Sequence, residues 1–118
     1  MKSFILLLAS SLTLSGCFAQ NTVCLTLEEN PYLGDPALSE FSKYVQVFGC
    51  FELLAESSIS DEKVLHAAAV AAELLDQNED GVVDDQSLAY ALASAQALMP
   101  IFKEEGSIAE EMLFEYYE

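Results

Sequence analysis

The sequence predicts a small, mainly α-helical domain with a minor β component, and three observations support this fold class. Residues 61–75 and 88–98 are rich in alanine, the residue with the highest helix propensity. Apolar residues between Leu38 and Phe48 recur at three- and four-residue spacing, as they do on one face of a helix. Two short apolar runs, 50–55 and 98–102, fit β-strands. The length of 118 residues allows one domain.

Residues 1–16 are expected to be an export signal. Lys2 precedes an apolar run that ends at Leu14 and is too short to span a bilayer as a mature helix. The run continues into Leu14-Ser15-Gly16-Cys17, which resembles the lipobox of bacterial lipoproteins. That resemblance implies cleavage before Cys17, a lipid on its sulfur, and attachment to a membrane through this anchor alone. Ordinary cleavage after Ala19, which would release a secreted protein, remains the alternative, and both readings predict export.

Residues 17–35 are expected to form a tether and residues 36–118 the helical domain. The tether contains turn signals, such as Asn30-Pro31. Asp35 and Pro36 suit the N-cap and first residue of a helix that would end at Gly49. The run 50–55 fits either a strand or more helix, and the glycine before it favours a strand.

Capping signals place three further helices. Ser60 is expected to cap a helix over Asp61–Leu75, with Ile59 and Val64 forming a hydrophobic staple. A second alanine-rich helix over Leu88–Leu98 must end near its last residues, because Pro100 cannot lie deep in a helix. The run 98–102 is then an edge strand. Ser107 and Glu110 form a capping box that begins the last helix.

The segment between the two alanine-rich helices carries the most informative motif. Asp76, Asn78 and Asp80 alternate along a short loop, Gly81 permits a sharp turn, and Asp84 follows. Calcium binds six to eight oxygen ligands, and alternate residues of a tight loop can direct their oxygens to one centre. We expect calcium as the cofactor, with five ligands, one of them a main-chain carbonyl: Asp76, Asn78, Asp80, Val82 (carbonyl) and Asp84.

This pattern, flanked by helices, resembles an EF-hand calcium loop over residues 76–87. It is also similar to the shorter loops of dockerins and thrombospondin type 3 repeats. The twelfth position, where the EF-hand pattern has a bidentate glutamate, is Ser87 here. The loss of two oxygens and a charge predicts weak affinity, about 10⁻⁴–10⁻³ M. The rival interpretation is a polar loop whose side chains only cap their own backbone.

A longer stretch, roughly from Phe41 to Lys103, resembles exported bacterial proteins that carry a single EF-hand-like loop. The resemblance is carried by Lys63-Val64-Leu65-His66-Ala67-Ala68 and by the residues from Leu74 to Asp84. Those proteins are longer and continue into a segment with histidine and glutamate. The resemblance therefore implies either a short relative or the front part of a longer protein.

Charge and cysteine content limit the possible partners. The net charge is −16, with 20 acidic and 4 basic residues, so nucleic acid is not an expected partner and cations are. If Cys17 is lipidated or removed, Cys24 and Cys50 are left, and an oxidising compartment favours a disulfide between them. Two unpaired thiols are the alternative.

No arrangement of catalytic residues stands out. His66 is the only histidine and is expected to pack within its helix, because no second histidine or suitably spaced cysteine accompanies it. We therefore expect a calcium-binding exported module with a structural or interaction role, more readily than an enzyme. Two alternatives stay open, namely the N-terminal fragment of an exported metal-dependent hydrolase and a metal-free envelope interaction protein.

Overall fold

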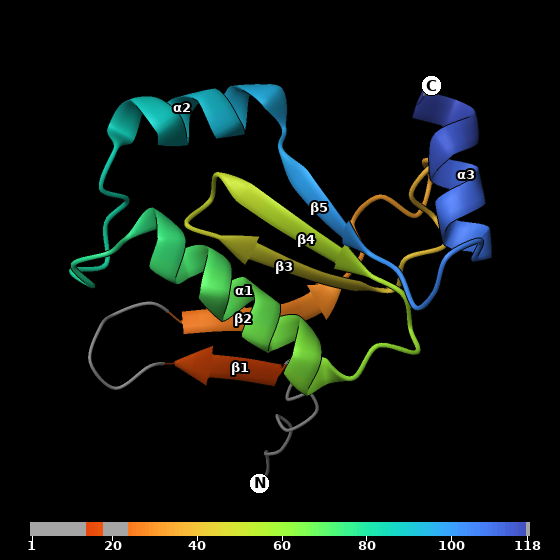
Figure 1. The fold of residues 1–118 in the computed structure, drawn as a ribbon, viewed down its shortest axis with the longest axis horizontal. Coiled ribbons are helices and arrows are strands. Elements are labelled where there is room, and N and C mark those ends of the chain that lie inside the picture. Colours follow the sequence, from red (N-terminus) through yellow and green to blue (C-terminus); the bar gives the residue numbers. More distant parts are fainter. Residues whose placement is uncertain (1–13, 18–23, 118) are drawn as a thin grey trace, which may run out of the picture.

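The computed structural model describes residues 14–17 and 24–117, and its fold is a mixed sheet covered by helices (Figure 1). The strands are β1 (Leu14–Cys17), β2 (Cys24–Glu29), β3 (Lys43–Val47), β4 (Phe51–Ala55) and β5 (Leu98–Ile101). The helices are α1 (Asp61–Leu75), α2 (Gln86–Ala95) and α3 (Ile108–Tyr117). The expected mainly α-helical fold class is therefore wrong, because a five-stranded sheet forms the centre of the molecule.

The strands lie in the sheet in their order along the chain. The first four form an antiparallel meander, whereas β5 is parallel to β4. Two neighbouring parallel strands need a crossover connection. Here the crossover consists of α1, the polar loop and α2, so the predicted helix–loop–helix is the link between β4 and β5.

The helix expected over residues 36–49 does not form. The apolar spacing that predicted it combines residues from two different elements. Leu38 and Phe41 are buried in a turn-rich segment, whereas Val45 belongs to β3, in which β-branched and aromatic residues favour an extended backbone. Gly49 has a positive φ of 69°, but it turns the β3–β4 hairpin instead of ending a helix. Its neighbour Phe48 also has a positive φ, of 54°, and a type I′ turn requires a positive φ at both of its central residues.

The segment expected to be a tether over residues 17–35 contains β2, which pairs with β1 and β3. Leu25 is buried in the core, and Asn30 is buried directly after the strand. The export signal expected over residues 1–16 lies almost wholly outside the described residues. The backbone of its last three residues belongs to β1, and the side chain of Cys17, the expected lipidation site, is not described.

Two clusters of buried side chains cover the opposite faces of the sheet. Successive side chains of a strand point to opposite faces. Accordingly Leu53 packs in a cluster with α1, while its neighbour Leu54 packs in another with Phe41 and with Ala109 of α3. Because both faces of β4 are buried, its sequence is a continuous apolar run apart from Glu52, which explains why its local pattern does not alternate.

The helices α1 and α3 follow the sequence prediction closely. α1 has the expected bounds, and the hydroxyl oxygen of Ser60 accepts a hydrogen bond from the Lys63 N–H at 3.2 Å. In α3 the Glu110 N–H donates to the Ser107 hydroxyl oxygen at 3.3 Å. Within the described ranges, no helix combines the length and apolar character needed to cross a bilayer.

Candidate metal centre

The polar loop begins where α1 ends at Leu75, and its two ends lie side by side. The Asp84 N–H donates to the Leu75 carbonyl at 2.8 Å, which closes the loop. Val83 is 5% exposed, and its burial in the core holds the last part of the loop in place. α2 then begins at Gln86, two residues earlier than expected, so the predicted 76–87 loop is shortened to residues 76–85.

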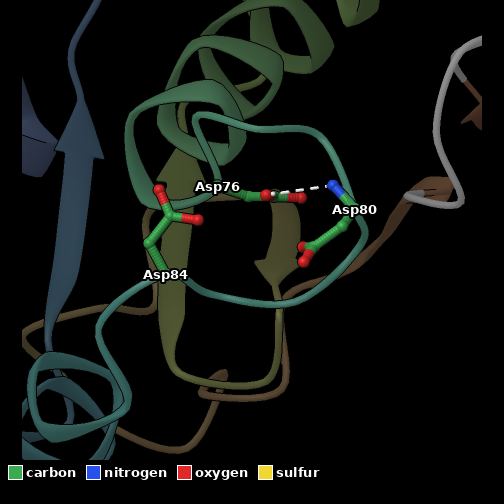
Figure 2. Close-up of side chains that lie close together, drawn as sticks. All are labelled: Asp76, Asp80 and Asp84. Carbon is green, nitrogen blue, oxygen red and sulfur yellow. Dashed lines mark hydrogen bonds between the residues drawn. The ribbon is translucent and has the colours of Figure 1, made fainter.

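Asp76 is the centre of this loop. Its side chain is only 2% exposed, and its two carboxylate oxygens accept hydrogen bonds from the N–H groups of Asp80 at 3.2 Å and Gly81 at 2.7 Å. Gly81 has a φ of 88°, a left-handed conformation that costs glycine little. Figure 2 shows the loop curving around the Asp76 carboxylate, with Asp80 and Asp84 on either side of it.

Three carboxylates converge in the loop. One oxygen from each of Asp76, Asp80 and Asp84 lies within 4.8 Å of the other two. Calcium–oxygen distances are about 2.3–2.6 Å, so two ligands of one ion can be at most about 5 Å apart. The three oxygens therefore meet the distance requirement for a shared hard cation, and carboxylates are the ligands that such an ion prefers.

The charge of the three carboxylates is not balanced by nearby basic side chains. The sequence has no lysine or arginine between Lys63 and Lys103. Among residues 24–117, the one ion pair joins Lys43 to Asp61 at 2.8 Å, at the other end of α1. Like charges this close repel each other, so the site electrostatically favours a bound cation.

The remaining expected ligands, Asn78 and the Val82 carbonyl, and the twelfth-position residue Ser87 have the following surroundings. Asn78 is exposed, and its side-chain oxygen accepts a hydrogen bond from the Asp80 N–H at 3.2 Å, while its role as a ligand stays a prediction. The Val82 N–H donates to Asp80 Oδ1 at 3.0 Å, while the role of the Val82 carbonyl stays a prediction. Ser87 lies in the first turn of α2, where its N–H donates to the capping carboxylate of Asp85 at 3.0 Å.

The expected Cys24–Cys50 disulfide is wrong. Cys50 is a free, buried thiol in the β3–β4 turn, and burial raises the pKa of this thiol, which keeps it protonated and unreactive. Cys24 is exposed at the start of β2, is itself disulfide-bonded, and lies opposite Cys17 in the β1–β2 register. The two cysteines are therefore not joined, because Cys50 carries a free thiol while Cys24 is already bonded.

Two further findings were not expected from the sequence. His66 is exposed on α1 instead of packing within the structure. A cavity of about 310 Å³ lies between residues 32–38, the end of α2 and α3. No local motif marks it, because Asp35 and Tyr117 on its walls are 82 positions apart in the sequence.

Comparisons with known proteins do not assign the chain to a class: no protein-family description, curated protein or solved structure matches it.

Proposed function

We propose that this chain is an exported module whose loop over residues 76–85 binds a calcium ion in a structural role. The observation that carries the proposal is the convergence of three carboxylates within 4.8 Å, one of them on a side chain that is 2% exposed. Clusters of acidic residues on a protein surface are common without a metal. Here, however, one carboxylate is buried at the centre of a closed loop, and its hydrogen bonds to the loop backbone fix the positions of the residues around it.

The expected affinity is low. Ser87 lies in the first turn of α2 and has no carboxylate, so the loop lacks the bidentate ligand of the twelfth position. Water would complete the coordination, which places the dissociation constant near about 1 mM, in the range of extracellular calcium modules. Such a site fits an extracellular environment and a permanent structural role better than a switch.

The structural role follows from the position of the loop. Asp76 caps the end of α1, and Asp84 directly precedes Asp85, the N-cap of α2. A cation held between Asp76 and Asp84 would join the end of one helix to the start of the next. It would also offset the repulsion among Asp76, Asp80 and Asp84, which otherwise destabilises the folded state.

Thermal unfolding in calcium tests the proposal. At about 10 mM calcium and a dissociation constant of about 1 mM, binding stabilises the folded state by about 1.4 kcal/mol. For a domain of this size the melting temperature should rise by roughly 5–10 °C. Sodium chloride at the same ionic strength is the reference, because screening alone also relieves repulsion.

Two variants distinguish a specific site from general acidity. Asp80→Asn combined with Asp84→Asn keeps side-chain oxygens that can accept the Val82 and Gln77 N–H groups, but removes two cluster charges. Glu79→Gln is the control, because Glu79 is an exposed acid of the same loop outside the cluster. The calcium response should disappear in the double variant and persist in Glu79→Gln. Equal responses in both variants, or none in the original protein, would disprove the calcium site.

Export is the second part of the proposal, and mass spectrometry of the purified protein tests it. A lipid mass on a chain that begins at Cys17 supports a lipid-anchored envelope protein, and a chain that begins at Gln20 supports a secreted one. If the Cys17 sulfur carries a lipid thioether, it cannot also form a disulfide with Cys24. The same mass spectrum therefore also tests whether these two cysteines are bonded. A chain that retains Met1 after passage through the envelope would contradict the proposed export signal.

One observation favours a second function, the metal-free interaction protein. α1 and α2 enclose an apolar groove of about 250 Å³ whose walls include Phe51, Leu74 and Leu88, and Leu74 is 68% exposed. Apolar side chains that remain exposed in a groove are typical of interaction surfaces. Concentration-dependent association that Leu74→Ser abolishes, together with no response to calcium, would favour this function over the calcium module.

A further inference from the structure

The cavity of about 310 Å³ lies away from the candidate metal centre, at the other end of the molecule. Its walls come from the segment after β2, from the end of α2 with the start of β5, and from α3. In Figure 1 α3 stands at the right of the molecule, whereas the loop between α1 and α2 forms its left edge. The volume is at the lower end of the range for small-molecule sites, about 300–1,000 Å³.

The wall formed by residues 30–38 is held in place by a buried side chain. Asn30 is 4% exposed, and its amide nitrogen donates to the carbonyls of Leu38 at 2.8 Å and Phe41 at 2.7 Å. Its side-chain oxygen accepts a hydrogen bond from the Tyr32 N–H at 2.7 Å. This part of the cavity is therefore preformed, so a ligand would not have to order it.

Tyr32 is fixed at both ends of its side chain. Its hydroxyl donates to Glu52 Oε1 at 2.6 Å, and its ring meets that of Tyr44 edge to face, with 6.2 Å between the ring centroids. The hydrogen bond to Glu52, together with burial, raises the pKa of Tyr32 to about 12, so its hydroxyl stays protonated at neutral pH. The ring is then a rigid wall of the cavity.

The chemistry of the cavity is that of a site for a positive charge. The described residues that line it include the acidic Asp35 and the aromatic Tyr32 and Tyr117, and none of these lining residues is basic. The Tyr117 hydroxyl donates to Asp35 Oδ2 at 3.5 Å, a long contact that leaves this oxygen with acceptor capacity. Leu98 and Leu113 add apolar surface. Aromatic faces and a carboxylate together attract organic cations.

We propose that this cavity binds a small organic ammonium ion, with the positive nitrogen between Tyr32 and Tyr117 and beside the Asp35 carboxylate. The apolar walls favour an alkylated ammonium over a hydrated metal ion, because methyl groups can be buried there without losing hydrogen bonds. The net charge of −16 raises the local concentration of any cation near the surface. The inference does not depend on the calcium site.

Choline is the probe, and its neutral isostere 3,3-dimethyl-1-butanol is the matched control. Both are titrated into the purified protein in EDTA, which removes divalent cations from the experiment, and binding is followed by NMR chemical shifts of the Tyr32 and Tyr117 rings. We expect choline to bind with a dissociation constant of about 1 mM and the neutral isostere at least about tenfold more weakly. Equal binding of the two compounds, or no binding of choline at about 50 mM, overturns the proposal.

Variants of the cavity test which groups make the site. Asp35→Asn retains an oxygen that can accept the Ala37 N–H, which Asp35 Oδ1 accepts at 2.9 Å, but removes the charge. We expect it to weaken choline binding about tenfold. Tyr117→Phe should change affinity less than twofold and Tyr117→Leu should lower it about fivefold, because only the second removes an aromatic face. Affinity that is unchanged in Asp35→Asn and Tyr117→Leu would place choline elsewhere and overturn the assignment.

Discussion

At the scale of single residues, Asn30 contributes more to the fold than its position after a strand suggests. It is buried, and all three of its hydrogen bonds are to backbone groups of the segment that leads into β3. The Leu38 carbonyl also accepts the Phe41 N–H at 3.3 Å, so Asn30 and one backbone hydrogen bond together hold this segment. A short polar side chain here takes the place of regular secondary structure.

Replacing this residue should be costly. Asn30→Ala removes the side-chain partner of the Phe41 carbonyl and of the Tyr32 N–H, and we expect the free energy of unfolding to fall by about 3 kcal/mol. Urea unfolding measures the change. Ser39→Ala is the control, because the Ser39 hydroxyl makes only a 3.5 Å contact with the Pro36 carbonyl and its removal should cost less than about 0.5 kcal/mol. Similar losses in the two variants would show that Asn30 is not the fixed point of this segment.

Two tyrosines with raised pKa values, the partly buried Tyr32 and the buried Tyr44, predict a loss of stability at alkaline pH. A hydrogen bond to Glu52 raises the pKa of Tyr32 to about 12, and burial raises that of Tyr44 to about 12. In the unfolded chain both ionise near about pH 10. The folded state therefore holds protons that the unfolded state releases, so stability is fully present below about pH 10 and falls as the pH rises toward 12.

Tyr32→Phe checks this interpretation through urea midpoints measured between about pH 8 and 11.5. The variant should lose about 1–2 kcal/mol at pH 8, because the Glu52 carboxylate loses a hydrogen bond. Above pH 10 its stability should fall less steeply than that of the original protein, since one of the two shifted groups is gone. Tyr90→Phe, at a residue that is 76% exposed, should reproduce the original profile. An unchanged slope in Tyr32→Phe would contradict the assignment.

At the scale of elements, α2 is the helix with the least burial. None of its residues is buried, although Leu88 and Tyr90 are large and apolar. Its ends are well formed, because Asp85 caps the first turn and Gln96 adopts a left-handed conformation with a φ of 54° at the C-terminal end. α2 is therefore held by its caps more than by packing, and local opening should begin there.

The C-terminal cap of α2 offers a pair of substitutions with opposite effects. Gln96→Gly places glycine where the backbone is left-handed, and we expect a stabilisation of about 1 kcal/mol. Ala93→Gly places the same residue at an exposed position inside the helix, and we expect a loss of about 1 kcal/mol. Thermal or urea unfolding of the two variants measures both. The same sign in both would contradict the left-handed cap.

How far the sequence predicts an element depends on how local its causes are. The bounds of α1 follow from the Ser60 cap and from alanine-rich helix propensity, which act within a few residues. β3 was missed because its helix-like spacing included Leu38 and Phe41, which are buried by contacts with other elements. β2 was missed because a short strand becomes recognisable only through its partners. The metal centre could be proposed from one contiguous motif, whereas the cavity could not, because three distant segments form it.

At the scale of the whole molecule, the excess of negative charge is the main influence on how stability depends on salt. The chain has a net charge of −16, with 20 acidic residues against 4 basic ones. Self-repulsion of this kind destabilises the compact state and is screened by salt. We expect the melting temperature to rise by several degrees when sodium chloride increases from about 20 mM to about 500 mM. The Asp80→Asn, Asp84→Asn double variant should show a smaller rise, and a melting temperature independent of salt would contradict the expectation.

The crossover between β4 and β5 has a consequence for folding kinetics. The turn between β3 and β4 spans only residues 48–50 and the connection between β2 and β3 spans residues 30–42, whereas β5 reaches its partner only after residues 56–97 have been ordered, and such closure is slow. A cation bound in the loop between α1 and α2 would hold these two helices together and so shorten the length of free chain that must close. If the loop holds a cation, calcium should therefore speed the final step of folding, the docking of β5, and leave the earlier formation of the hairpin unaffected.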